Sequence, residues 1–162
     1  MFFVETKLEK MNYQLAQINI ARLLAPLDSP QLKEFSDFLD PVNKLGEESP
    51  GFVWRLKDET NAATEVETPF DDDMLIVNMT VWETIADLRF FVYNTVHSYF
   101  LKSRKKWFSK MEKPHVVLWW VEEGHIPSLE EAKLKLELLE REGPSPAAFS
   151  LQTLFDPQGN KL

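Results

Sequence analysis

The stretch from Met74 to Met111 constrains the fold of this chain more than any other. Its first part, 74–82, is almost continuously apolar, which predicts a strand covered on both faces. Its second part predicts a long helix over 84–106 that is apolar nearly all round in its middle. A helix of this kind is covered on more than one side. We therefore expect the rest of the chain to pack against this strand and helix.

The other elements follow from periodicity and from turn residues. Strands are predicted over 13–20, 52–56, 115–121 and 149–155, and further helices over 31–45 and 128–142. The first six elements then read β-α-β-β-α-β, the order of the ferredoxin-like α+β fold, followed by an extra C-terminal helix and strand. We expect one domain over 12–155, an N-terminal arm over 1–11 and a C-terminal tail over 156–162.

The predicted strands carry apolar residues on both faces, although the two helices of a ferredoxin-like unit cover only one face of its sheet. Two protomers that pack sheet against sheet would cover the other face and form an eight-stranded dimeric α/β barrel. The sequence therefore favours a homodimer.

Several short patterns predict where helices begin, bend and end. Ser29-Pro30 suits an N-cap followed by proline, and Ser128 with Glu131 forms a capping box. Thr84 with Asp87 resembles a second such box. Pro41 predicts a kink or break near Asp40. The inner stripe of the last helix is predicted to be Leu129, Ala132, Leu136 and Leu139.

Composition excludes several classes of function. The chain has 162 residues, a net charge of −8 and no cysteine. The negative field disfavours nucleic acid and anionic membrane surfaces, and thiolate chemistry is impossible without cysteine. The apolar runs are shorter than the roughly 20 residues that span a bilayer. We expect a cytoplasmic protein with no nucleic-acid or membrane partner.

An acidic loop over 58–73 holds seven Asp or Glu residues and no Lys or Arg. Calcium binding is one interpretation, but the spacing does not match an EF-hand loop and no glycine makes its sharp turn. A solvated connection between two strands is the favoured interpretation. No other cluster has metal-ligand spacing.

His97 is the histidine inside the long predicted helix, where Tyr93 and Arg104 would share its face. It is interpreted either as a general base or axial haem ligand at a pocket, or as a structural histidine. The basic run 102–106 would meet an anionic group such as a carboxylate, or would be a solvated helix end.

Other candidates lie on the strands. Asn19, Arg55 and Asn78 are polar residues in strands that are otherwise buried, so they either satisfy one another or face a polar ligand. The five tryptophans would pack in the core or wall a cavity for a flat ligand. Trp119 and Trp120 are neighbours on one strand and must face opposite sides.

Six segments together resemble a bacterial family known as domain of unknown function 3291. They are Tyr13–Arg22, Ser49–Leu56, Leu75–Glu83, Phe91–His97, Trp107-Phe108 and Val117–Val121. The family is similar to the dimeric α/β-barrel superfamily, which includes cofactor-free antibiotic-biosynthesis monooxygenases and haem proteins.

The resemblance implies an enzyme that oxidises a small hydrophobic or aromatic molecule without a cofactor. His97 would be the base, and Asn19, Asn78 and Arg55 would orient or stabilise an anion. Trp54, Trp82 and Trp119 would wall the pocket, with Tyr93 and Arg104 beside the substrate. Haem binding at His97 and a non-catalytic ligand-binding or assembly module are the alternatives.

Overall fold

The computed structural model describes residues 12–57 and 69–162. Within them, five strands form one antiparallel sheet: β1 (Tyr13–Leu23), β2 (Phe52–Arg55), β3 (Leu75–Trp82), β4 (Phe108–Ser109) and β5 (Val116–Glu122). The order across the sheet is β2-β3-β1-β5, and the short β4 pairs with the end of β1. This is the predicted βαββαβ arrangement, so the α+β fold class is confirmed. The predicted arm and most of the acidic loop lie outside the described residues.

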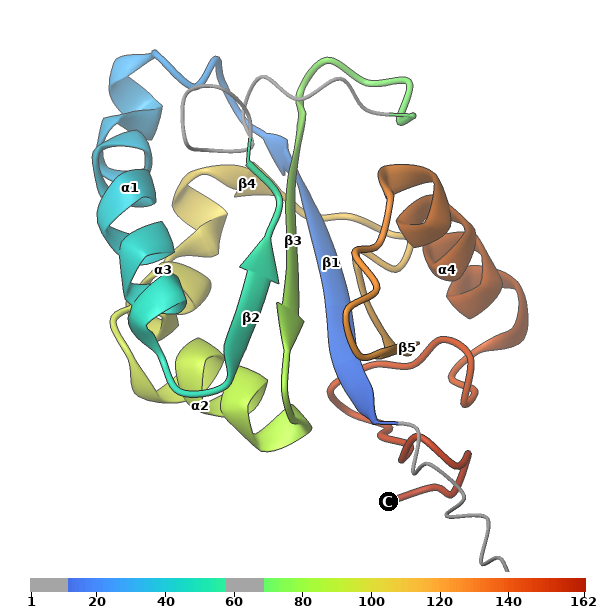
Figure 1. The fold of residues 1–162 in the computed structure, drawn as a ribbon. Coiled ribbons are helices and arrows are strands. Elements are labelled where there is room, and N and C mark those ends of the chain that lie inside the picture. Colours follow the sequence, from blue (N-terminus) through green and yellow to red (C-terminus); the bar gives the residue numbers. More distant parts are fainter. Residues whose placement is uncertain (1–11, 58–68) are drawn as a thin grey trace, which may run out of the picture.

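The helices form two layers on opposite sides of the sheet (Figure 1). On one side lie α1 (Lys33–Glu48), α2 (Ile85–Asn94) and α3 (His97–Lys102), with the short 3-10 turns η1 (Pro30–Leu32) and η2 (Arg104–Lys106). On the other side lies α4 (Leu129–Glu142). No helix within the described residues is long and apolar enough to cross a membrane.

The first layer differs from the prediction at α1. The helix passes through Pro41 without a break, and it includes Gly46, which lies beyond the predicted end at residue 45. Gly46 lies beside Phe91, and an added Cβ would be 3.4 Å from the Phe91 ring. Ser29 lies at the predicted N-cap position and Pro30 follows it, although they begin the 3-10 turn η1 and Ser29 makes no side-chain capping bond.

The predicted helix over 84–106 is also wrong in its length, because the chain leaves helical geometry at Thr95. Thr95 has extended backbone angles; its hydroxyl donates to Phe91 O at 2.6 Å and accepts from His97 N–H at 3.2 Å. This side chain satisfies backbone groups on both sides of the break. The capping by Thr84 is confirmed, with Thr84 Oγ1 accepting from Asp87 N–H at 3.1 Å.

The second layer explains why the strands are apolar on both faces. The predicted stripe of α4 is confirmed, since Leu129, Ala132, Leu136 and Leu139 are all buried. They pack with alternate residues of the central strands, including Ile18, Met79 and Trp119. A helix of the same chain thus covers much of the face that was expected to need a partner subunit. The homodimer stays a prediction, and this burial no longer requires it.

The predicted last strand, 149–155, is wrong. Phe149 makes a single bridge to Leu118 of β5, and the chain then turns. The tail does not extend away either, because Phe155 bridges to Lys161 and Leu162 N–H donates to Leu154 O at 2.9 Å. Phe149 is fully buried against Trp120, so this segment seals one edge of the sheet.

Candidate functional site

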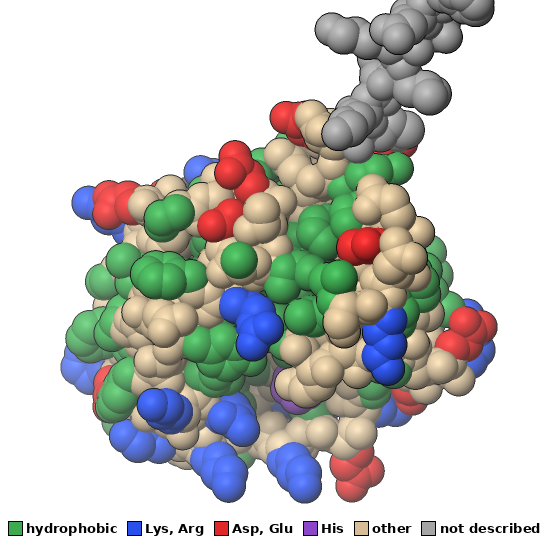
Figure 2. Space-filling view, turned by 90° about the horizontal axis from the view of Figure 1, so that it is seen from below, with side chains coloured by type: hydrophobic (Ala, Val, Ile, Leu, Met, Phe, Trp, Pro, Cys, Tyr) green, Lys and Arg blue, Asp and Glu red, His purple; other side chains and the backbone are tan. Residues whose placement is uncertain are grey.

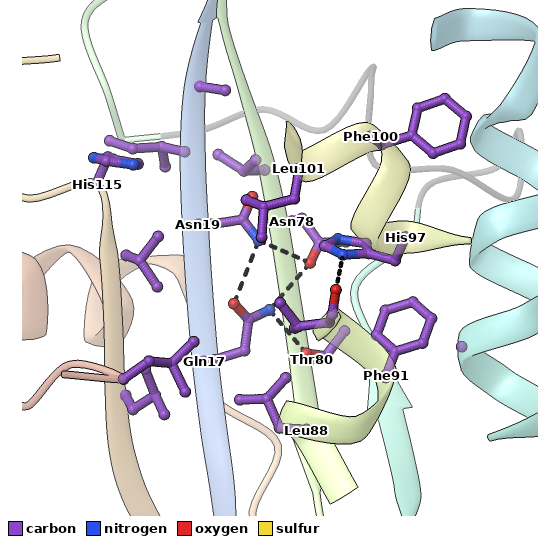
Figure 3. A pocket seen from close by; sticks show the side chains of 18 of the residues that line it. Gln17, Asn19, Asn78, Thr80, Leu88, Phe91, His97, Phe100, Leu101 and His115 are labelled. Carbon is purple, nitrogen blue, oxygen red and sulfur yellow. Dashed lines mark hydrogen bonds between the residues drawn. The ribbon is translucent and has the colours of Figure 1, made fainter. Parts of the chain in front are cut away.

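A cavity of about 830 Å³ lies between the sheet and the helices α1, α2 and α3. A volume of this size is typical of small-molecule sites. Its sheet side is lined by polar residues of β1 and β3, and its helix side by apolar residues such as Phe35, Leu88, Phe91 and Phe100. Figure 3 shows side chains from the two strands and from α2 and α3 converging on this space.

The sheet side carries a continuous hydrogen-bond network. Antiparallel pairing places Gln17 opposite Thr80 and Asn19 opposite Asn78. Gln17 Nε2 donates to Asn78 Oδ1 at 3.0 Å and to Thr80 Oγ1 at 2.8 Å. Asn19 Nδ2 donates to Gln17 Oε1 and to Asn78 Oδ1, both at 3.3 Å, and Trp82 Nε1 donates to Thr80 Oγ1 at 2.8 Å. The cross-strand pairs thus fix four polar side chains as one unit.

This network leaves the N–H donors of one amide group unused. As the three amides are assigned, Asn78 Oδ1 accepts two hydrogen bonds, so its acceptor side is used within the network. Its Nδ2 makes no hydrogen bond to any described residue, although Asn78 lines the cavity. Two N–H donors therefore face the cavity, and they suit a carbonyl oxygen or an oxyanion.

His97 lies at the first turn of α3, and its ring projects toward the strands (Figure 3). The side chain is partly buried and its ring contacts that of Phe91, with 5.0 Å between the centroids. Its Nδ1 lies 3.2 Å from Val92 O. Desolvation by burial holds the pKa of His97 below 6.5, although the bond to Val92 opposes this shift.

The bond to Val92 also fixes the tautomer of the neutral imidazole. A carbonyl oxygen can only accept, so Nδ1 carries the proton and Nε2 carries the lone pair. His97 thus presents a neutral base next to a cavity whose opposite wall offers amide donors. Proton removal together with stabilisation of the resulting anion is the chemistry that this arrangement suits.

Two arginines line the cavity, of which one is buried and ion-paired and the other is exposed. Arg55 is buried, and its Nε donates to Glu47 Oε1 at 2.7 Å, so its charge is balanced by an acid on α1. Arg104 is exposed and donates to Leu101 O at 2.7 Å. Tyr93 also lines the cavity and is 44% exposed. The break at Thr95 means that Tyr93, His97 and Arg104 share the cavity without sharing one helical face.

Two tryptophans that were expected to wall the pocket do not line it. Trp119 lies on the other face of β5, where its Nε1 donates to Glu131 Oε2 of α4 at 2.8 Å. Trp54 also packs on that face, because a bulge between Phe52 and Trp54 shifts the alternation of β2. Trp82 is the candidate tryptophan that does line the cavity, and it is fully buried. The expectation that Trp119 and Trp120 face opposite sides is confirmed.

Sequence reasoning missed Gln17 and Thr80. Both lie two residues from a predicted polar residue, Asn19 or Asn78, and so share its face of the strand. This spacing of two residues along each strand was the signal that could have identified Gln17 and Thr80. Among residues 12–57 and 69–162, no group of three or more His, Asp and Glu residues is arranged to hold a metal ion.

The lowered pKa of His97 predicts how stability depends on pH. The unfolded chain binds a proton near pH 6.5, whereas the folded chain binds it only at lower pH. This contribution to stability is therefore complete above pH 6.5 and is lost as pH falls toward the folded pKa, by at most about 1.4 kcal/mol per pH unit. Urea unfolding between pH 5 and 7 should show this slope, and His97→Gln should reduce it. An unchanged slope in His97→Gln would contradict the assignment.

A family model described as "Domain of unknown function (DUF3291)" matches residues 14–162, and it is the family that the sequence segments resemble. No curated protein matches the chain. Solved structures are also similar, among them the following three.

The protein of unknown function NE2512 from Nitrosomonas europaea is 13% identical, with 72% of this chain and 96% of that chain covered and a TM-score of 0.44. PA3566 from Pseudomonas aeruginosa is 14% identical, with 72% and 98% covered and a TM-score of 0.43. A monooxygenase from the gene ActVA-Orf6 of Streptomyces coelicolor, in complex with Nanaomycin D, is 16% identical, with 73% and 94% covered and a TM-score of 0.35.

Proposed function

The chain belongs to the DUF3291 family, and we propose that it is a cofactor-free monooxygenase that oxidises a small aromatic molecule in the cavity. The observation that carries this proposal is the pairing of the neutral base His97 with the donor amide of Asn78. A base and an oxyanion site in one cavity are what a reaction through a resonance-stabilised anion requires.

The reaction begins with proton transfer. His97 Nε2 takes a proton from a phenol, or from a CH₂ group that lies between two aromatic rings and across the central ring from a carbonyl. The electron pair of the broken bond moves into the ring system as a phenolate or enolate, whose oxygen accepts hydrogen bonds from Asn78 Nδ2. Dioxygen oxidises this anion: one oxygen atom becomes the new carbonyl, and the other leaves as water with two hydrogens. These hydrogens come from the CH₂ group or, in a phenol, from the hydroxyl and from the ring C–H that the new carbonyl replaces.

The apolar walls support this role. Leu88, Phe91 and Trp82 enclose the space beside the polar floor. Exclusion of water strengthens hydrogen bonds to a developing anion and protects it from reprotonation. A flat aromatic substrate would also gain contact with the rings of the walls.

Oxygen uptake tests the proposal. Purified protein is given anthrone, a three-ring compound with an acidic CH₂ group, and oxygen consumption is compared with formation of the quinone. We expect uptake of one dioxygen per quinone without added cofactor. Asn78→Asp should lower the turnover number about 10²-fold or more, because an acceptor replaces the donor that stabilises the anion.

The result for Asn78→Asp also tests the orientation of the network. If all three amides were rotated together, Asn78 would present an oxygen to the cavity, and Asn78→Asp would be tolerated. Binding of anthrone without turnover would instead support a non-catalytic ligand-binding module and would overturn the enzyme proposal.

The second candidate is a haem protein, and the geometry of His97 favours it specifically. An axial histidine commonly donates its other ring N–H to a backbone carbonyl, as His97 Nδ1 does to Val92. In that case Nε2 would hold the iron. The absorption spectrum of the protein as purified, and after addition of haemin, separates the two candidates. A Soret band that is lost in His97→Ala would favour the haem protein.

A further inference from the structure

The charged residues that line the cavity are arginines. The chain carries 26 Asp and Glu residues against 18 Lys and Arg. Among the described residues that line the cavity, however, there is no Asp or Glu, whereas Arg55 and Arg104 both line it. A cavity without acids in an acidic protein favours an anionic ligand over a neutral or cationic one.

The two arginines are not equivalent as ligand groups. The charge of Arg55 is balanced by Glu47, which leaves little attraction for a further anion. Arg104 makes no ion pair with any described acid and donates one hydrogen bond, to Leu101 O. Its guanidinium has five N–H donors in a planar fork that matches a carboxylate.

The segment of the chain around Arg104 carries further positive charge. Residues 88–113 hold seven Lys or Arg residues and one acid, although the whole chain has a net charge of −8. Lys102, Lys105 and Lys106 are exposed and pair with no described acid. Figure 2 shows the molecule from below, with Lys and Arg side chains gathered on the lower part of the view, around a recessed histidine. An anion that approaches the cavity on this side meets a positive surface.

We propose that the substrate is an aromatic carboxylate whose rings occupy the cavity and whose carboxylate binds Arg104 at its mouth. This proposal rests on the function proposed above and adds its substrate class. The reacting part of the rings lies at His97 and Asn78, and the carboxylate fixes which end of the molecule enters first. Arg104 is thus a specificity-determining residue that takes no part in the proton transfer.

The test compares two ligands of the same shape and different charge. 6-Hydroxy-2-naphthoate and its neutral carboxamide are titrated by calorimetry into the wild-type protein, Arg104→Gln and the control Lys105→Gln. Lys105 is an exposed cation of the same 3-10 turn that does not line the cavity. We expect the wild type to bind the carboxylate about tenfold more tightly than the carboxamide, and Arg104→Gln to remove this preference.

Lys105→Gln should keep most of the preference, since it loses only part of the long-range field. Equal binding of the two ligands by the wild type, or a full preference in Arg104→Gln, would overturn the inference. If the carboxamide binds equally well and anthrone is still oxidised in a His97-dependent reaction, the proposed function stands and the substrate class is wrong. If neither ligand binds and anthrone is not oxidised, both proposals fail.

Discussion

Replacing His97 by glutamine should lower the turnover number of the oxidation by about 10²- to 10⁴-fold, the usual contribution of a positioned general base. Glutamine keeps a polar group of similar length but has no basic nitrogen. The Michaelis constant should change little, because the amide donors and apolar walls that bind the rings remain. Steady-state oxygen uptake with anthrone gives both quantities.

The control for this variant is His125→Gln. His125 is exposed, lies on the side of α4 and contacts Glu131 at 2.7 Å, so it has no contact with the cavity. It should retain the wild-type rate. If His97→Gln and His125→Gln retain equal rates, His97 is structural, and the proposed mechanism loses its base.

The pH dependence of the same reaction follows from the environment of His97. Its pKa lies below 6.5 because burial disfavours the imidazolium. The base form therefore persists to lower pH than in an exposed histidine, and the acid limb of kcat/KM should have its midpoint below pH 6.5. A midpoint above pH 6.5 would contradict the desolvated state of the ring.

The order of elements was predictable because it depends on patterns that can be recognised in the amino-acid sequence itself. The strands around Ile18, Met79 and Trp119 are apolar on both faces, and proline or glycine separates several of the segments. These patterns predict the strands, the split βαβ order and the inner stripe of α4. They do not predict which partner covers the second face, since a helix of the same chain and a second subunit leave the same apolar pattern.

The errors arise where a local contact overrides a local preference. Thr95 ends α2 through its own hydroxyl, although the residues around it are apolar enough to continue the helix. Pro41 and Gly46 stay within α1, where Gly46 lies against Phe91. The segment after Phe149 has the apolar content of a strand but finds only one bridge at the edge of β5. Such contacts depend on which residues meet in the folded chain, and the spacing of apolar residues along the sequence does not determine this.

The candidate site was predictable in part for the same reason. Asn19, Asn78 and His97 stand out because each is polar or titratable in an apolar surrounding, and the structure brings all three to one cavity. Trp54 and Trp119 were assigned to the wrong face. For Trp119 the alternation gave only that it opposes Trp120, and for Trp54 a bulge shifted the alternation. The unused N–H donors of Asn78 Nδ2 could be identified only from the hydrogen bonds between β1 and β3.

Replacing Leu136 by aspartate should destabilise the protein by roughly 3–5 kcal/mol, since it removes a buried side chain and buries an unpaired charge. Leu136 is 6% exposed, on the stripe of α4 that covers the second face of the sheet. Leu134 lies on the same helix and is 65% exposed, so Leu134→Asp is the matched control. It should change stability by less than about 0.5 kcal/mol.

Urea unfolding measures both variants, and size-exclusion chromatography with light scattering gives their mass. A large loss for Leu136→Asp alone means that α4 covers the sheet in solution. In that case any homodimer must use a surface other than this face. Small and equal losses for the two variants, together with the mass of a dimer, would mean that α4 is displaced and that a second subunit covers the sheet. The barrel expected from the strands would then exist, and the burial of Trp119 against α4 would not describe the assembled protein.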